Sequence, residues 1–125
     1  MKDHLDKVKE IRMSGRYNCA QTLLMAYADA MEITEEEAEN MGRLFGGGMS
    51  HGGVCGTISA AFMILGTKGY QAQVANQLLQ EFRKKNHSTE CVELLTEAKK
   101  HGTPKKEHCD RLIFEMAEFL DTYMK

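Results

Sequence analysis

Apolar residues recur every three or four positions along almost the whole of this chain. No alternation of apolar and polar residues, which would indicate a β-strand, persists beyond a few positions. Pro104 is the only proline among the 125 residues, so little interrupts a helical backbone. The pattern predicts an all-α fold. We expect residues 1–125 to form a single-domain bundle of about six to seven helices.

Capping residues and glycines set the expected limits of these helices. Asn18, Thr34 and Ser88 are predicted N-caps, and Thr34 with Glu37 has the spacing of a capping box. Thr103 is expected to cap the last helix, with Pro104 in its first helical position. The predicted helices span about residues 3–13, 18–31, 34–45, 54–65, 70–85, 88–102 and 104 to the carboxyl end. The glycine-rich segment 46–53 between the third and fourth is predicted to be a loop.

Charge and composition argue against several classes of partner. The formal net charge is −2, which gives no overall attraction to nucleic acid or to anionic membranes. The longest weakly polar run, residues 54–66, is too short to span a bilayer, so no membrane insertion is expected. The amino-terminal residues are charged and show no secretory signal, which indicates a cytoplasmic protein. Structural disulfides are not expected in that compartment.

Four cysteines therefore need another explanation. Cys19, Cys55, Cys91 and Cys109 include no Cys-x-x-Cys pair of the kind found in zinc knuckles, thioredoxins and compact ferredoxins. Cys19, Cys91 and Cys109 fall on the apolar faces of three predicted helices. A free cysteine alone is ordinarily a small core residue. Four that converge in one small bundle would offer a tetrathiolate pocket or two dithiol pairs.

Cys55 differs from the other cysteines in its local setting. It follows the glycine-rich loop and is expected in the first turn of an apolar helix, where the positive helix end would favour its thiolate form. It is therefore the candidate catalytic thiol. His51 could act as a base or an extra ligand, although loop histidines are usually solvated. The same solvated setting is expected for His87 and His108, and Lys105–Lys106 is expected to be a solvated helix end.

The arrangement of these motifs resembles a known family. The matching pieces are Tyr17-Asn18-Cys19-Ala20, Gly46-Gly-Gly-Met49 leading to Gly53-Val54-Cys55-Gly56, Glu90-Cys91-Val-Glu-Leu94, and His108-Cys109. Together they resemble the redox-active proteins named for a Cys, Gly-Cys-Ala-x-x-Gly, Cys, Cys signature, over about residues 15–122. These are small helical prokaryotic proteins, and the module is similar to part of the split-Soret cytochromes. Thr57 and Ala60 stand where the signature has alanine and glycine, and Val54 separates Gly53 from Cys55.

The resemblance implies a redox role for the four cysteines. In the split-Soret relatives the comparable cysteines are associated with an iron–sulfur cluster. Carried over to this chain, that association makes Cys19, Cys55, Cys91 and Cys109 the cofactor-binding and metal-ligating residues of a [2Fe–2S]-type cluster. No Cys-x-x-Cys-His motif occurs, so haem attachment of the c type is not expected.

Three hypotheses remain at this point. The first is electron transfer or redox sensing with an unknown redox partner protein, through an iron–sulfur cluster or through exchanging dithiol/disulfide pairs in which Cys55 attacks. The second is an interaction module with a structural tetrathiolate zinc site. The third is a helical adaptor whose cysteines only fill the core. An oxidoreductase-type activity stays open, as does a homodimer, because the glycine loop would let a neighbouring chain approach closely.

Overall fold

The computed structural model describes residues 4–124, and this part of the chain is helical without a strand. The all-α prediction is confirmed. The elements in chain order are α1 (Leu5–Met13), α2 (Cys19–Ala26), α3 (Ala28–Met31), α4 (Glu35–Gly42), η1 (Gly48–Gly52), α5 (Gly56–Thr67), α6 (Ala72–Asn86), α7 (Cys91–Lys100) and α8 (Lys105–Tyr123). Within these residues, no helix has the length and apolar composition needed to cross a bilayer.

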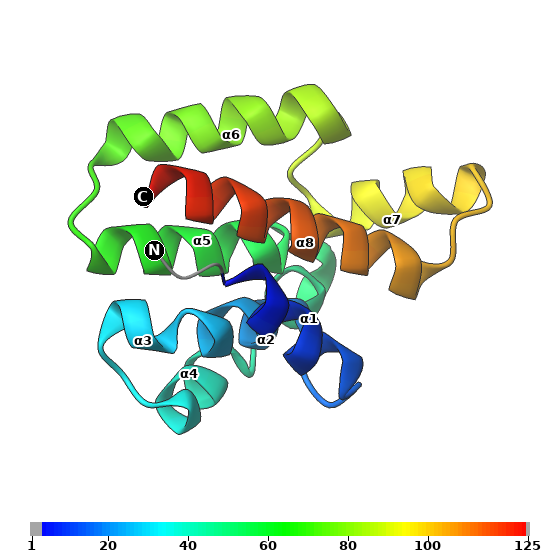
Figure 1. Cartoon of the computed structure of the whole chain (residues 1–125). Helices are drawn as coiled ribbons and strands as arrows, with labels where there is room; N and C mark the ends of the chain where they lie inside the picture. Colours follow the sequence, from blue (N-terminus) through cyan, green and yellow to red (C-terminus); the bar gives the residue numbers. More distant parts are fainter. Residues whose placement is uncertain (1–3, 125) are drawn as a thin grey trace.

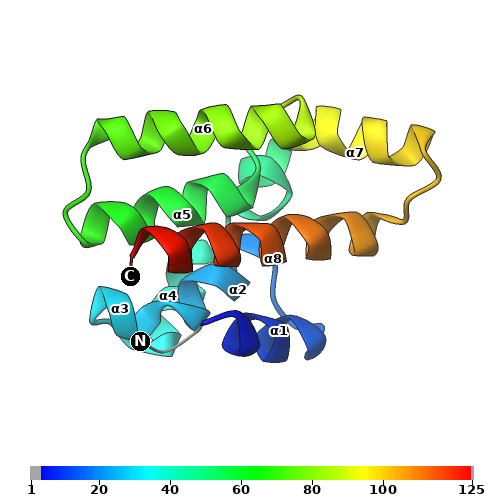
Figure 2. The same ribbon diagram turned by 45° about the horizontal axis from the view of Figure 1, so that its top comes forward.

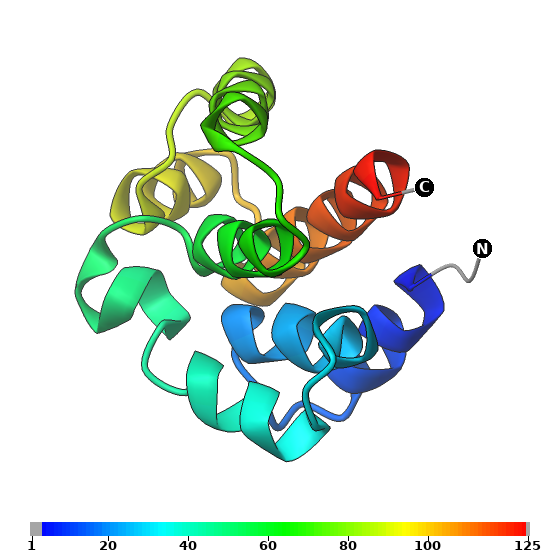
Figure 3. The same ribbon diagram turned by 90° about the vertical axis from the view of Figure 1, so that its left-hand side faces the viewer.

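Three helices form the centre of the bundle. α2, α5 and α8 contact one another pairwise (Figure 1). α1 and α4 pack against α2, and α7 packs against α8. Figure 2 shows α6 and α7 along one side of the molecule and α1 to α4 along the other. The view along α5 in Figure 3 shows that helix between α6 and α2. Segments far apart in the sequence therefore meet around α5.

The core consists mainly of aliphatic side chains from the three central helices. Leu23 of α2, Ile58 and Ile64 of α5, and Ile113 and Leu120 of α8 are all fully buried. α5 also buries small residues on several sides, as expected for a helix that is apolar nearly all round. Burial of this apolar surface is the main source of stability in such a bundle.

The helix predicted over residues 18–31 is broken in the structure. Tyr27 lies between α2 and α3 with φ −101° and ψ 12°, which ends the regular helix. Its side chain is fully buried, and its hydroxyl donates to the carbonyl oxygen of Ala117 in α8 at 2.9 Å. The break therefore accompanies a tertiary hydrogen bond that local sequence does not indicate.

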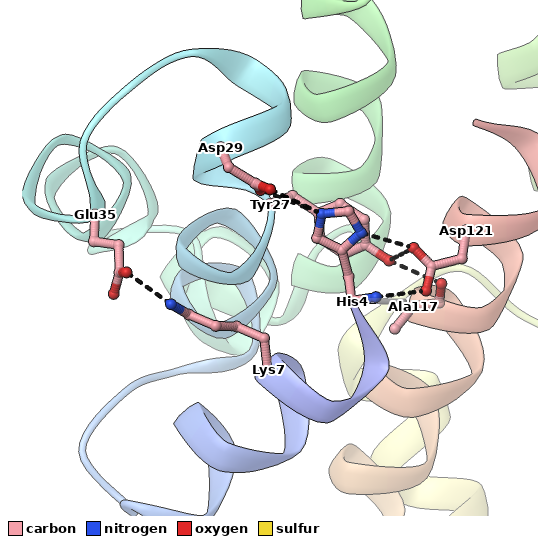
Figure 4. A network of polar contacts seen from close by, with 7 residues as sticks. All are labelled: His4, Lys7, Tyr27, Asp29, Glu35, Ala117 and Asp121. Atoms are coloured by element: carbon pink, nitrogen blue, oxygen red, sulfur yellow. Dashed lines mark hydrogen bonds and ion pairs between the residues drawn. The ribbon is translucent and has the colours of Figure 1, made fainter. Parts of the chain in front are cut away.

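Hydrogen bonds of His4 connect the start of α1 to the rest of the bundle. His4 lies with its Nδ1 atom 3.0 Å from Asp121 Oδ1 and its Nε2 atom 3.2 Å from Asp29 Oδ1 (Figure 4). Its ring stacks on Tyr27 with the centroids 4.3 Å apart. One side chain thereby ties the amino-terminal helix to α3 and α8.

The predicted N-caps are correct for two helices and wrong for two others. Asn18 and Thr34 each cap a helix within a complete capping box. Ser88 does not cap a helix: the N-cap of α7 is Glu90, whose amide donates to the Ser88 hydroxyl at 3.1 Å. α8 likewise begins one residue later than predicted, with Pro104 as its N-cap in place of Thr103.

The glycine-rich segment is more ordered than a simple loop. It contains the single wide turn η1, inside which Met49 and Ser50 have positive φ angles of 56° and 67°. Gly48 has φ 66°, a conformation that glycine adopts without a steric penalty. α5 then begins at Gly56, so Cys55 is its N-cap and not a residue of its first turn.

Candidate functional site

The four cysteines line one cavity of about 210 Å³. Cys19 begins α2, Cys55 caps α5, Cys91 begins α7 and Cys109 lies in the second turn of α8. All four are free thiols. The structure therefore brings together side chains that are separated by as many as 90 positions in the sequence, and three of them lie at the beginnings of helices.

Cys19 is positioned by the capping residue before it. The Asn18 side chain accepts the amide of Gln21 at 2.8 Å, and its own amide donates to the carbonyl oxygens of Gly42 and Arg43. These bonds fix the start of α2 against the end of α4. The Cys19 sulfur then packs so closely on Gly56 that a Cβ atom there would lie 2.6 Å from it. Only glycine fits at position 56 in this arrangement.

Cys55 and Cys91 enter the cavity from two paired segments. The Cys55 amide donates to the Thr89 carbonyl at 2.8 Å, and the Cys91 amide donates to the Gly53 carbonyl at 2.6 Å. Between them Val54 and Glu90 form an isolated antiparallel bridge. Because both cysteines are anchored through the backbone, the glycine-rich segment sets their positions together.

The surroundings of Cys55 are the most enclosed of the four. Its side chain is 5% exposed, and its sulfur lies 3.1 Å from the Thr57 hydroxyl oxygen. Thr57 is one of the positions at which the chain departs from the signature, and it contributes a polar group to an otherwise apolar part of the cavity. His51 is exposed and is absent from the cavity lining, which matches the solvated setting expected for a loop histidine.

Burial raises the pKa of the other three thiols and so disfavours their thiolate forms. It raises the pKa of Cys19 to about 12, and the neighbouring cysteines add to the shift because thiolates repel one another. Burial also raises the pKa of Cys91 and of Cys109. This electrostatic coupling of Cys19 to the other three cysteines follows from their position around one cavity.

Two cations of the cavity wall oppose this effect. Arg12 and Lys105 both line the cavity; each lowers the pKa of Cys109, and Lys105 also lowers that of Cys91, although burial outweighs them. Arg12 is held by Asp110, to whose carboxylate its Nε atom donates at 2.5 Å. Burial raises the pKa of Asp110, but hydrogen bonds from Arg12 and Lys106 outweigh it and lower the net value. No sequence motif indicates Arg12. Lys105 is exposed in the first turn of α8, as predicted for a solvated helix end, and it also borders the cavity.

His108 is also part of the cavity wall. Its side chain is 5% exposed, so the solvated position expected for it is wrong. Burial lowers its pKa and Arg111 lowers it further, so both favour the neutral imidazole. The only sign of it in the sequence is its position directly before Cys109.

The thiols share a cavity without meeting at one point. Among residues 4–124, no group of three or more His, Cys, Asp or Glu side chains has a geometry that would hold a metal ion. The geometry is that of four donors distributed around a common space.

Comparison with known proteins identifies the family. The model of the family described as "Putative redox-active protein (C_GCAxxG_C_C)" matches residues 17–123, a span that contains all four cysteines. The chain belongs to this family. No curated protein and no solved structure matches it. The C_GCAxxG_C_C membership confirms the resemblance found in the sequence and assigns a redox-active class to the four-cysteine module.

Proposed function

We propose that this C_GCAxxG_C_C protein transfers electrons or senses redox state through a [2Fe–2S]-type cluster held by its four cysteines. The observation that carries the proposal is the single cavity lined by Cys19, Cys55, Cys91 and Cys109. Residues 1–125 would then act as one redox domain that exchanges electrons with a partner protein. A cytoplasmic location fits this role because cellular reductants keep unloaded thiols reduced.

The donor set fits such a cluster. Thiolates are the usual protein ligands of iron–sulfur clusters, and a [2Fe–2S] cluster takes two of them on each iron. It therefore needs four thiols, and the four cysteines that line the cavity supply that number. A tetrathiolate zinc site needs all four sulfurs around a single ion. When bound, the cluster would supply one-electron transfer.

The residues of the wall have separate tasks in this proposal. Leu94, Leu95 and Leu112 form an apolar part of the lining that limits the access of water. Binding of a metal centre requires loss of the thiol protons, which burial alone disfavours. Arg12 and Lys105 supply positive charge on the same cavity and offset part of the negative charge that then accumulates.

A dithiol/disulfide pair is the second candidate, supported by the surroundings of Cys55. The Thr57 hydroxyl, 3.1 Å from the Cys55 sulfur, can donate a hydrogen bond to a thiolate and stabilise it. Cys55 would then attack a disulfide of an oxidised partner, and a second cavity cysteine would displace the partner. The two cysteines lose two protons and two electrons as their disulfide forms, and the partner gains two thiols.

Metal and sulfide analysis of protein purified without oxygen tests the proposal. We expect equal amounts of iron and acid-labile sulfide, a visible absorption spectrum, and loss of both in variants that change any of the four cysteines to serine. Val92→Ser is a matched control, since Val92 follows Cys91 but is 55% exposed and is absent from the cavity lining.

Other results would assign the alternatives. Colourless protein that releases zinc to a thiol reagent would contradict the cluster and support the structural site. Metal-free protein that loses titratable thiols in pairs on mild oxidation would support the dithiol mechanism. Unchanged folding and unchanged partner binding after replacement of all four cysteines by serine would leave them as core residues only.

A further inference from the structure

An unpaired polar atom lies in the wall of the four-cysteine cavity. His108, in the first turn of α8, is 5% exposed, and its Nε2 atom has no hydrogen-bond partner among residues 4–124. A buried polar atom without a partner costs free energy, and such atoms are rare in native proteins. A partner that is absent from the isolated chain would account for it.

The groups nearest to His108 do not supply that partner. The positive charge of Arg111 acts on the His108 imidazole and lowers its pKa. The Arg111 side chain donates hydrogen bonds to Asn86 Oδ1 at 3.1 Å and to Glu115 Oε2 at 2.8 Å. The backbone amide of His108 is engaged with the Pro104 carbonyl at 3.0 Å. The nearby charges are thus already paired with one another.

His108 lines both the four-cysteine cavity and a second cavity of about 330 Å³, whose lining is mostly polar and includes His101. Solvent in this second cavity does not reach the Nε2 atom, which is fully buried. Strong hydrogen-bond acceptors would be present in the four-cysteine cavity when a redox centre is bound, because thiolate and cluster sulfide sulfurs carry negative charge. Cys109 follows directly in the chain, and both residues line that cavity.

We propose that His108 is a positioning residue that donates an N–H···S hydrogen bond from Nε2 to a sulfur of the loaded redox centre. This inference rests on the proposed function. Hydrogen bonds to cluster sulfurs stabilise the more negative, reduced state and so raise the reduction potential. The buried Nε2 atom, which has no partner among residues 4–124, would gain one when the centre is bound.

The experiment compares His108→Leu, which removes the donor, with His108→Gln, which retains an N–H donor. His101→Leu is the histidine control, since His101 lines only the second cavity of the two. In reduced, metal-free protein we expect His108→Leu to raise the melting temperature by roughly 5 °C, because the unpaired buried atom is removed. In loaded protein we expect its reduction potential to fall below that of the wild type, with His108→Gln restoring most of the difference.

A lower melting temperature in metal-free His108→Leu, or an unchanged reduction potential, would overturn the inference and make His108 a structural residue. Loss of the centre from both His108→Leu and His108→Gln would also overturn it, because His108 would then be a ligand. Loss from His108→Leu alone would support the need for a donor. Wild-type protein without iron and sulfide would instead contradict the proposed function itself, so the two failures are distinguishable.

Discussion

Gly56 follows Cys55 and begins α5, and it packs closely against the sulfur of Cys19. A methyl group at this position would lie 2.6 Å from that sulfur and 2.9 Å from the carbonyl oxygen of Phe45. We expect Gly56→Ala to lower the free energy of unfolding by about 1–3 kcal/mol and to reduce the iron content, because the Cys19 side chain must move. Urea denaturation and iron analysis measure the two effects.

Gly66 in the same helix provides the control. Its Cβ would meet no atom within 4 Å, so Gly66→Ala is expected to stabilise the protein by up to about 1 kcal/mol through helix propensity. Similar losses of stability in both alanine variants would show that the close approach of Cys19 is not what requires glycine at position 56.

The buried thiol of Cys19 predicts a loss of stability at alkaline pH. Its pKa of about 12 in the folded protein lies above that of an exposed cysteine, so the unfolded chain ionises first as the pH rises. The contribution of the protonated Cys19 thiol to the free energy of unfolding is fully present below about pH 8.5 and is lost as the pH rises to about 12. We expect reduced, metal-free wild type to lose more stability between about pH 8 and about pH 10.5 than Cys19→Ser does. Parallel pH profiles in urea denaturation would contradict the assignment.

The residues of the site differ in how far the sequence revealed them. The four cysteines are recognisable from residue type and from their motifs. Arg12, Lys105 and His108 are of types that are usually solvated, and only the packing of α1 and α8 around the cavity makes them part of its wall. Such groups cannot be selected without knowing which helices are neighbours.

Among the elements, the two confirmed capping boxes differ in how far their contacts reach. Asn18 caps α2 and also bonds the end of α4, whereas the Thr34 cap of α4 is exposed and makes only its local pair with Glu37. We expect Asn18→Ala to cost about 2 kcal/mol and Thr34→Ala about 1 kcal/mol, measured by urea denaturation. Asn18→Ala should also expose Cys19 to faster alkylation, which Thr34→Ala should not do. Equal effects on Cys19 would contradict a positioning role for the α2 cap.

Element boundaries were predictable where local bonds decide them. Asn18 and Thr34 form their caps with residues three positions away, so their motifs identify the helix starts. Ser88 has the same local signal, but residues 89–91 pair with the backbone of residues 53–55. The Gly53 carbonyl accepts the first amide of α7, and the helix begins at Cys91 because of this tertiary contact. The break at Tyr27 likewise accompanies a tertiary hydrogen bond to α8, which the local sequence does not reveal.

At the scale of the whole molecule, α2 and α5, which position Cys19 and Cys55, are well buried, whereas the outer helix α6 is not. In α2, seven of eight residues are buried, whereas α6 buries only Leu78, Phe82 and Asn86 among its 15 residues. α6 lies at the outside of the bundle and contributes no residue to the lining of the cysteine cavity (Figure 3). Local opening follows such differences in burial. The protein therefore consists of a stable centre around the thiols with a more weakly attached outer helix.

Hydrogen–deuterium exchange read by mass spectrometry tests this division. In metal-free protein we expect the amides of α6 to exchange faster than those of α2 and α5, because fewer buried contacts oppose their opening. Loading of the redox centre should slow exchange at the starts of α2, α5 and α7 and in the first two turns of α8, where the cysteines lie. α6 is the internal control and should not respond. Protection that spreads equally over α6 would mean that the thiols are coupled to global folding and do not form a locally organised site.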